Sequence, residues 1–478
     1  MSVATATGQK AWVKAIPNPA ANEFAATELS ILEGAIPAGL RGTLYRNGPG
    51  RLERGRDRAA HWFDGDGAIL RVQFNDDGAT GTFRFVQTAG YLAEAEANKL
   101  LFNGYGTLIK GPIWKRLSIS VKNTANTSVL ALPDKLLALW EAGPPHALDL
   151  ESLETRGVEL LDELQENSPY SAHPKRDPLT GEIYNFGVSF GTRGTLNLYR
   201  SDRSGRILKR HAIALQGLPM IHDFMIAGPY LVFFISPVYL NGLAVLTGKK
   251  GYSDALEWQP QKGTQILVVD RESLEEVSHG QAEPWFQWHY GNGFVDADGS
   301  VVVDLARYED FQTNQYLSEV VLGRTVTNAK SAYWRVQLDP KSGRVQKTHT
   351  ILDRICDFPV VAPDRVGQSY RYAYLSVHGP DADYPSEYFG SIARVDVETG
   401  DTDIATAGKN RYPMEPIYAP DALNSEQGWV VTVVFDGDCE SSEVWIYDRE
   451  GLADGPVCKL ALPDIVPLGF HGKWHPAA

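Results

Sequence analysis

Four histidines stand in similar surroundings at widely separated points of the chain. They are His173 in SPYSAHPKRDP, His222 in LPMIHDFMI, His289 in WFQWHYGNGF and His471 in PLGFHGKW. Each is flanked by large apolar residues or lies just before a turn, which favours an inward-facing strand end over an open surface. Any one of them could be a core histidine bonded to a backbone carbonyl, but four in the same setting indicate a shared site. Imidazoles that meet make a metal site, and an all-nitrogen set suits zinc, copper, iron or nickel.

Three acidic residues stand in equally apolar surroundings. Glu141 lies in LLALWEAGPPH, Asp357 in RICDFPVV and Glu415 in YPMEPIY. A lone buried carboxylate is costly unless it is paired, and a metal-bound imidazole needs its second nitrogen held, usually by a carboxylate. The three acids therefore fit as partners of the four histidines. The alternative for each acid is a salt bridge to a neighbouring arginine or lysine.

The elements that must position these residues are predicted to be short strands. Segments rich in β-branched and aromatic residues recur along the chain. They are LLALW (136–140), YLVFFI (230–235), QILVVD (265–270), SVVVDL (300–305), RYAYLSV (371–377), GWVVTVVF (428–435) and SEVWIYD (442–448). An Asp-x-x-x-Gly turn recurs between such segments, at 77–81, 177–181, 339–343 and 396–400. Asp caps a turn of this kind, and Gly supplies its positive φ.

Repeated antiparallel hairpins along the chain favour a propeller or a large barrel over βαβ units. No Walker sequence, Rossmann glycine fingerprint or linker interrupts them, so we expect one domain over residues 1–478, with 1–35 as an N-terminal extension. Seven blades would average about 68 residues each, and the four histidines would then come from different blades. The innermost strands of different blades converge on the central axis, where imidazoles from distant segments could meet.

The composition argues against several classes of function. Of the 478 residues, 43% are apolar and 22% are charged, which is typical of a globular protein. The net charge of −14 argues against a nucleic acid partner, which requires a basic face. Cys356, Cys439 and Cys458 match neither a zinc site nor a redox pair. With no secretory signal and no apolar run long enough to span a bilayer, the chain is expected to be cytoplasmic and to meet a membrane only at its surface.

Two stretches mix apolar and basic residues in the way that an interfacial surface does. Residues 101–119 place Lys110 and Lys115 beside Ile113 and Trp114, and residues 236–252 include VYLNGLAVLTGKKGY. We expect peripheral membrane contact through both stretches.

Ten motifs resemble, in order, those of the carotenoid cleavage oxygenase family, and within it the branch of cyanobacterial apocarotenoid oxygenases. They are GTLYRNGPG, HWFDGDGAI, KNTANTSV, LLALWEAGPPH, SAHPKRDP, MIHDF, WHYGNGF, CDFPVV, MEPIYAP and FHGKW, and they extend over nearly the whole chain. The resemblance implies an all-β, seven-bladed β-propeller with iron on its central axis and a cap of loops and short helices over its top face.

The resemblance also implies a role for each candidate residue. One Fe(II) per chain would be held by four histidines and no carboxylate: His173, His222, His289 and His471. The acids that hold these imidazoles would be Glu141, Asp357 and Glu415. Thr127, in KNTANTSV, falls where the branch has a threonine whose methyl group crowds one open iron position.

The chain departs from the family pattern at Asp357, where the family has Glu. The side chain is one methylene shorter, so its bond to an imidazole could need a water molecule or a shifted strand. His61 and His146 fall outside the implied ligand positions, and His475 is expected on the surface, as are His211, His279 and His349.

The activity implied is that of a non-haem Fe(II) dioxygenase with O2 as co-substrate. It would cleave a carbon-carbon double bond of a hydrophobic apocarotenoid, bound in a dry aromatic tunnel, to give two aldehydes, such as retinal from an apocarotenal. Four neutral imidazoles would leave a divalent iron with positions open for dioxygen. One alternative is cleavage of a stilbene such as resveratrol, with Lys122 as its phenolate partner unless Lys122 is an exposed strand charge. The other is a propeller that binds a ligand or protein without catalysis.

Overall fold

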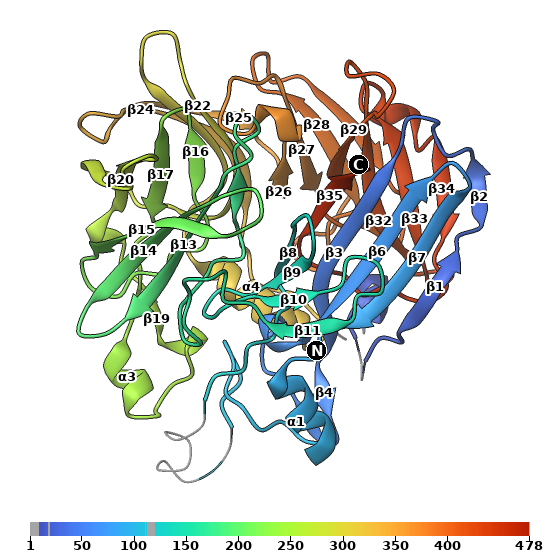
Figure 1. The fold of residues 1–478 in the computed structure, drawn as a ribbon, viewed down its shortest axis with the longest axis horizontal. Coiled ribbons are helices and arrows are strands. Elements are labelled where there is room, and N and C mark those ends of the chain that lie inside the picture. The colour runs from blue at the N-terminus through green and yellow to red at the C-terminus, as the bar shows by residue number, and fades with distance from the viewer. Residues whose placement is uncertain (1–8, 18–19, 110, 112–119, 478) are drawn as a thin grey trace, which may run out of the picture.

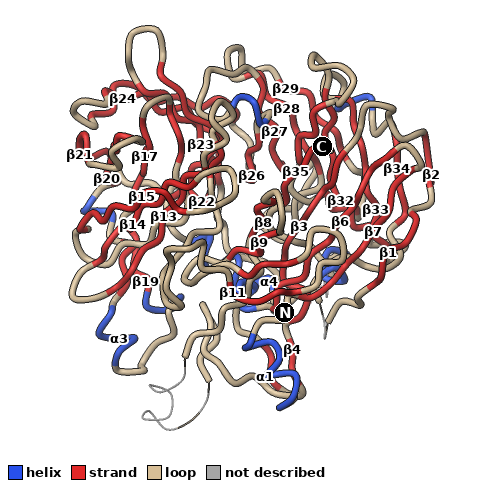
Figure 2. Tube along the Cα trace, viewed as in Figure 1, coloured by secondary structure: helices blue, strands red, loops and turns tan. Residues whose placement is uncertain are grey.

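The computed structural model describes residues 9–17, 20–109, 111 and 120–477, and strands make up nearly all of its regular structure (Figure 2). Seven sheets of four to six strands form the blades of a β-propeller, as predicted. Figure 1 shows the sheets arranged side by side, with the first strands, in blue, next to the last, in red.

We number the blades 1 to 7 along the chain, and each is antiparallel. Blade 1 contains β1 (Phe24–Glu28), β3 (Gly42–Arg51), β6 (Asp66–Asn75), β7 (Gly78–Phe85) and β35 (Gly472–Pro476). Blade 2 contains β8 (Ser128–Ala131), β9 (Leu136–Leu139), β10 (His146–Leu148) and β11 (Thr155–Val158). Blade 3 contains β12 (Lys175–Arg176), β13 (Ile183–Phe190), β14 (Gly194–Ser201) and β15 (Ile207–Ala214). Blade 4 contains β16 (Met225–Ala227), β17 (Tyr230–Ile235), β20 (Thr264–Asp270) and β21 (Glu276–Ala282).

The remaining blades follow the same plan. Blade 5 contains β22 (Phe286–Val295), β23 (Val301–Tyr308), β24 (Ser331–Asp339) and β25 (Arg344–Leu352). Blade 6 contains β26 (Cys356–Val360), β27 (Tyr372–Val377), β28 (Ser391–Asp396) and β29 (Thr402–Thr406). Blade 7 contains β2 (Ile31–Gly34), β30 (Arg411–Pro413), β31 (Ile417–Pro420), β32 (Gly428–Asp436), β33 (Ser441–Asp448) and β34 (Cys458–Ala461).

The ring is closed by strands from both ends of the chain. In blade 1, β35 pairs with β3, and Thr43 lies opposite His475. In blade 7, β2 pairs with β34, and Ile31 lies opposite Leu460. Residues 1–35, which we expected to be an extension, thus supply β1 to the first blade and β2 to the last.

Turns of the predicted Asp-x-x-x-Gly type join strands in three blades. At 177–181 the Gly181 amide donates to the Asp177 carbonyl at 2.8 Å, and Gly181 has a φ of 76°. The turns at 339–343 and 396–400 are built in the same way. The prediction is wrong at 77–81, because β7 already begins at Gly78. The Asn75 side chain there accepts a bond from the Asp77 amide, which makes a tighter turn.

The apolar faces of neighbouring blades pack on one another. Between blades 3 and 4, Leu196 and Leu198 of β14 pack with Leu231 and Phe233 of β17, and all four side chains are fully buried. Burial of a side chain of this size stabilises a fold by about 1.5–3 kcal/mol. This packing fixes the blades with their innermost strands around the axis.

Helices and long loops cover one end of the propeller, as expected. Among the described residues the α-helices are α1 (Ala89–Ala97), α3 (Gly242–Leu246) and α4 (Gln312–Val320). Two short ribbons pair β4 (Glu53–Arg54) with β5 (Asp57–Arg58) and β18 (Val238–Leu240) with β19 (Leu256–Trp258). In Figure 1, α1 and α3 project from the lower end of the molecule. No helix in the described part of the chain is long and apolar enough to cross a membrane.

Candidate metal centre

Each blade contributes one of the seven predicted histidines and acids. The four histidines lie in, or just before, the inner strands of blades 3, 4, 5 and 1: His173 before β12, His222 before β16, His289 within β22 and His471 before β35. The three acids come from the other blades, with Glu141 between β9 and β10, Asp357 in β26 and Glu415 between β30 and β31. The propeller geometry therefore brings together residues that are far apart in the sequence.

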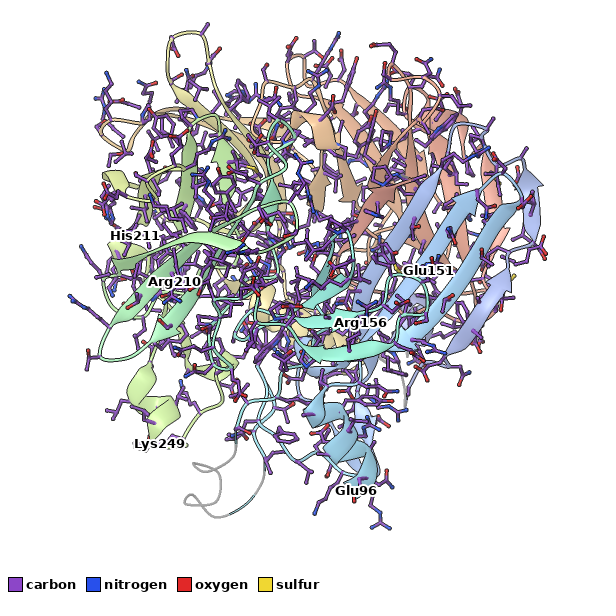
Figure 3. The ribbon with its side chains drawn as sticks, in the orientation of Figure 1. Glu96, Glu151, Arg156, Arg210, His211 and Lys249 are labelled. Atoms are coloured by element: carbon purple, nitrogen blue, oxygen red, sulfur yellow. The ribbon has the colours of Figure 1, made fainter. Side chains whose placement is uncertain are left out.

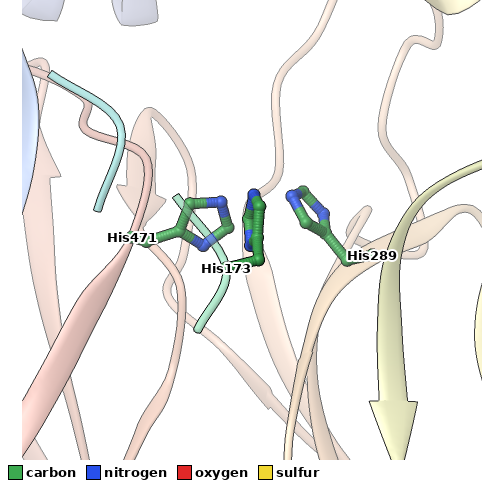
Figure 4. A group of neighbouring side chains, drawn as sticks. All are labelled: His173, His289 and His471. Atoms are coloured by element: carbon green, nitrogen blue, oxygen red, sulfur yellow. The ribbon is translucent and has the colours of Figure 1, made fainter. Parts of the chain in front are cut away.

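The rings of the four histidines lie close together. The centroid of the His173 ring is 4.4 Å from that of His222, 5.3 Å from that of His289 and 4.8 Å from that of His471. The Nε2 atoms of His222 and His289 are 3.4 Å apart. Figure 4 shows His173 between His289 and His471, and one ring nitrogen of each of these three lies within 4.8 Å of the others. A metal ion with bonds of about 2.1 Å to nitrogen could lie among them.

Asp357 holds His289 through a direct hydrogen bond. The His289 Nδ1 is 2.7 Å from Asp357 Oδ1, and both side chains are buried. A carboxylate accepts, so Nδ1 carries the proton and Nε2 is left as a lone pair that could bind a metal. The second oxygen, Oδ2, accepts a 2.6 Å bond from the Tyr308 hydroxyl. Burial, with the nearby Asp357 charge, raises the pKa of this phenol well above its usual range, so it stays a donor.

The backbone of β26 is distorted where the shorter acid reaches the imidazole. The pairing of β26 with β27 shifts register between Asp357 and Val360, and Phe358 has a φ of 54°, which a bulky residue adopts only at a cost. Of the two alternatives left open for Asp357, the structure does not use the bridging water molecule, because the contact is direct. A displaced strand, which was the other expectation, accompanies that contact.

Glu415 holds His471 from the interruption between β30 and β31. Its Oε1 lies 3.0 Å from His471 Nδ1, and its Oε2 accepts a 2.6 Å bond from the amide of Gly472, the next residue along the chain. The Arg46 guanidinium, fully buried nearby, donates to the Glu415 carbonyl at 2.8 Å. The His471 imidazole and the Arg46 charge lower the pKa of Glu415 against the opposing effect of burial, so the carboxylate stays ionised.

Glu141 is placed more loosely than the other two acids. Its Oε1 lies 3.4 Å from His222 Nδ1 and 3.6 Å from His173 Nε2, and about a third of its side chain is accessible, at 32%. Desolvation, followed by the charge of Asp223, raises its pKa well above its usual range. Glu141 is also close enough to His173 and His222 to be a metal ligand itself.

The cluster presents neutral nitrogen donors. Burial lowers the pKa of His173 and His222 well below its usual value, and the adjacent imidazoles lower it further. Burial also lowers the pKa of His471, against the raising effect of Glu415. The His173 Nε2 is enclosed without a hydrogen-bond partner among the described residues. Four imidazoles, one with an orphaned nitrogen, fit a divalent transition metal such as Fe(II).

Thr127 lies beside the cluster, just before β8. Its carbonyl accepts a 3.3 Å bond from the His471 amide, and its hydroxyl donates to Asn126 Oδ1 at 3.1 Å. The side chain lines the same cavity as the histidines. Because the hydroxyl is engaged by Asn126, the methyl group is the part of the side chain left to make apolar contacts.

A cavity of about 670 Å³ extends from the histidines and is lined by His222, His289 and His471. Its walls are mainly aromatic and include Trp62, Trp140, Phe186, Phe190, Trp288 and Phe470. Its described lining contains no lysine or arginine. A cavity of this kind suits a long apolar ligand with few polar groups.

The other histidines lie away from the cluster or serve the structure. His61 is buried, and its Nδ1 accepts a 3.1 Å bond from the Phe63 amide, which caps a short 3-10 turn. His146 is buried in β10, and His475 is half-buried in β35. His211, on the outer strand β15, is labelled far from the axis in Figure 3.

Lys122 is neither an exposed charge nor a cavity residue. Its ammonium is buried in ion pairs with Asp66 and with Glu94, at 2.6 Å from the latter. Both predictions for Lys122 are therefore wrong, because the two carboxylates engage its ammonium and it does not line the cavity. Tyr308 is the site residue that the sequence did not reveal. It stands in an ordinary strand segment, ARYED, with no local signal of a buried acid 49 residues away.

Comparison with known proteins gives consistent matches over the whole propeller. Residues 18–476 match the family model described as retinal pigment epithelial membrane protein. The chain is 32% identical to the apocarotenoid-15,15'-oxygenase of Synechocystis over 456 residues, which cover 93% of this chain and 92% of that enzyme. It is 26% identical to resveratrol cleavage oxygenase 1 of Aspergillus fumigatus, with 94% of this chain and 92% of the relative covered.

Solved structures give the same result. The cobalt-substituted Synechocystis apocarotenoid oxygenase has a TM-score of 0.88 and 31% identity, with 98% of both chains covered. A variant of the same enzyme with a threonine replaced by alanine has a TM-score of 0.87 and 30% identity, covering 98% of this chain and 100% of the other.

Proposed function

The chain belongs to the carotenoid oxygenase family of the retinal pigment epithelial membrane protein, and on that premise we propose that it is an iron(II) dioxygenase. It would use O2 to cleave one double bond of an apocarotenoid and release two aldehydes, such as retinal from an apocarotenal. The observation that carries the proposal is the convergence of four imidazoles on the wall of an aromatic cavity.

The residues of the site have different proposed roles. His173, His222, His289 and His471 would hold the iron, which when bound supplies the activation of dioxygen. Asp357 and Glu415 keep the proton of their imidazoles on Nδ1, so that Nε2 is free for the metal. The aromatic walls would align the polyene beside this centre and keep water away.

Thr127 is proposed to restrict the space beside the metal. Its hydroxyl is engaged by Asn126, so the methyl group would narrow the cavity at this point. Solved variants of the Synechocystis enzyme replace a threonine, and a tryptophan and a glutamate 13 and 14 residues after it. Thr127, Trp140 and Glu141 of this chain have the same spacing, which supports a shared arrangement.

Cleavage of a hydroxystilbene is the second candidate, because stilbene-cleaving relatives match nearly the whole chain. The lining favours the apocarotenoid. No lysine or arginine is present among the described lining residues to pair with a phenolate, and Lys122 is occupied by Asp66 and Glu94. A third candidate, a propeller that binds without catalysis, would contain almost no iron and would consume no oxygen with any polyene or stilbene.

Peripheral membrane contact is proposed through the end of the molecule that bears α1 and α3. Leu243 and Leu246 of α3 are 72% and 74% exposed, and Lys249 and Lys250 follow them. Figure 3 places Lys249 at the same lower end as Glu96 of α1. Val121, which lines the cavity, is also exposed. Of the stretch 101–119, residue 110 and residues 112–119 lie outside the described residues.

Vesicle binding tests this contact. Replacing Leu243 and Leu246 with Ser should reduce co-sedimentation with vesicles of phosphatidylcholine and phosphatidylglycerol. Leu179 and Leu423 are equally exposed, at 76% and 75%, on turns elsewhere, and their replacement by Ser is the matched control. Equal loss in both pairs would reject the proposed surface.

Product identification tests the activity. Iron-loaded protein is incubated with an apocarotenal and, separately, with resveratrol, and the aldehydes are identified by mass. We expect two aldehydes from the apocarotenal, with oxygen consumed in proportion. Aldehydes from resveratrol alone would establish the second candidate, and no product with either would support the third.

A further inference from the structure

One imidazole in the cavity wall is not used by the candidate metal centre. His378, directly after β27, is 6% exposed and lines the cavity. Its backbone is fixed, because its amide donates to the Ile355 carbonyl at 3.2 Å and its carbonyl accepts from Arg354 at 3.1 Å. Its Nδ1 has no hydrogen-bond partner among the described residues. The Nε2 of the same ring also has no hydrogen-bond partner among the described residues and, unlike Nδ1, is not fully enclosed, so a polar group in the cavity could bond to it.

A second polar group with a free proton lies against this imidazole. The rings of His378 and Tyr384 meet at 5.1 Å in a T-shaped contact, and Tyr384 also lines the cavity. The Tyr384 hydroxyl accepts a 2.6 Å bond from the Ala329 amide, so its own proton remains available. Two other phenols of the wall are already engaged: Tyr308 donates to Asp357, and Tyr105 to Asn314.

His378 and Tyr384 lie in the cavity at a distance from the metal centre. Aromatic rings connect the two places: Phe358 is 5.1 Å from His289, Phe389 is 6.4 Å from Phe358, and His378 is 4.8 Å from Phe389. A ligand that reached from the histidine cluster to His378 would therefore cross an apolar stretch before it met a polar group. An elongated apolar molecule with a polar end has this pattern.

The chemistry of the wall limits what that polar end can be. The described lining contains no lysine or arginine, so an anionic end group would find no counter-charge. Burial lowers the pKa of His378 to about 4, so the ring is neutral near pH 7 and can donate through one nitrogen and accept through the other. The group that fits is neutral and carries oxygen.

We propose that His378 and Tyr384 form a subsite that binds the hydroxyl or carbonyl end group of an otherwise apolar substrate. The inference rests on the proposed function, since the same cavity receives the polyene. The subsite would fix how far the chain enters the cavity and, with it, which double bond lies beside the four histidines.

Binding of three ligands that differ in one oxygen tests this subsite. They are all-trans-retinol, all-trans-retinal and the hydrocarbon in which the hydroxyl of retinol is replaced by hydrogen. Affinities are measured by quenching of tryptophan fluorescence on the full chain under anaerobic conditions, so that binding is separated from cleavage. In His378→Phe we expect about tenfold weaker binding of retinol and retinal, with the hydrocarbon unchanged. An equal effect on all three ligands would overturn the proposal.

Two further variants separate recognition from damage to the fold. His378→Gln keeps a donor and an acceptor, so it should recover most of the discrimination that His378→Phe loses. Phe389→Leu changes an apolar neighbour in the same wall and should affect all three ligands alike. If His378→Gln binds no better than His378→Phe while both unfold at the wild-type temperature, the subsite is rejected. The test is independent of the proposed activity, because discrimination by binding would persist in a chain that cleaves nothing.

Discussion

Two of the proposed ligands are each held by a carboxylate from another blade. Asp357 of blade 6 holds His289 of blade 5, and Glu415 of blade 7 holds His471 of blade 1. In both places a buried carboxylate holds the Nδ1 of a proposed metal ligand, at 2.7 Å for Asp357 and His289 and at 3.0 Å for Glu415 and His471. The second oxygen of Asp357 is satisfied by a side chain, the Tyr308 hydroxyl. The second oxygen of Glu415 is satisfied by the backbone amide of Gly472.

The difference shows how a shorter acid can serve where the family has a longer one. Both acids lie where the strand pairing is irregular. The pairing of β26 with β27 shifts register beside Asp357, where Phe358 has a positive φ. Glu415 lies between β30 and β31, whose pairings with β32 differ in register by one residue. The two pairs differ in the group that binds the second carboxylate oxygen, which for Asp357 is a replaceable side chain, Tyr308. For Glu415 that group is the backbone amide of Gly472, which only a substitution by proline would remove, so side-chain mutation should affect the two pairs unequally.

Removal of either carboxylate should have the largest effect on metal binding. Asp357→Ala and Glu415→Ala each leave a proposed ligand free to rotate and to change tautomer, for which we expect about 10–100-fold weaker Fe(II) affinity. Affinity is measured by competition with a chelator of known strength. His349→Ala, on the half-buried edge strand β25, is the control. Wild-type affinity in both carboxylate variants would show that these bonds do not support the metal.

Replacing Asp357 with the longer Glu should distort the contact with His289, which is the shorter of the two carboxylate–imidazole contacts. Asp357→Glu adds a methylene where the contact is already 2.7 Å, and overpacking of this kind typically costs about 1–3 kcal/mol. We expect a lower free energy of unfolding in urea. A matched shortening, Glu415→Asp, should instead lengthen the bond to His471 and weaken metal binding. A stability gain in Asp357→Glu would mean that β26 is not fitted to the shorter side chain.

Loss of the Tyr308 hydroxyl should have a smaller effect than loss of a carboxylate, and it should affect only the pair of Asp357 and His289. Tyr308→Phe removes the donor to Asp357 Oδ2 and leaves that oxygen buried without it, at a cost of about 1–2 kcal/mol in stability. With cobalt in place of iron, the visible absorption of the metal should shift, because the orientation of His289 changes. Tyr199→Phe, which also removes a buried tyrosine hydroxyl but lies in blade 3, should leave the spectrum unchanged. Identical spectra for wild type and Tyr308→Phe would show that Tyr308 does not position His289.

Substitution of His146, a buried histidine without a carboxylate partner, should have the smallest effect, and it should change stability only at acidic pH. Burial lowers the pKa of His146 to about 4, below its unfolded value, so the unfolded chain binds the proton more readily. Stability is therefore unaffected above about pH 6.5 and falls as the pH drops toward 4, by about 1 kcal/mol at pH 5.5. His146→Gln should flatten the fall of the melting temperature between pH 6.5 and pH 4.5. The same slope in the variant would assign the acid sensitivity to other groups.

Much of the site was visible in the sequence because apolar flanks mark inward-facing strand ends. The strand segments and hairpins predict the propeller. The shared setting of the four histidines predicts the cluster. Backbone geometry was not visible: nothing in CDFPVV announces the positive φ of Phe358 or the direct bond that accompanies it. Contacts between distant segments are also hidden in the sequence, including the bond from Tyr308 to Asp357 and the ion pair of Lys122 with Glu94.

Iron content in two terminal variants tests the central claim most directly. His471 and His475 lie four residues apart in the last strand segment, but only His471 contacts the cluster. Measured by elemental analysis after loading with Fe(II), wild type and His475→Ala should each contain close to one iron per chain, and His471→Ala almost none. A full complement of iron in His471→Ala, with its loss in His475→Ala, would contradict the assignment of the metal centre.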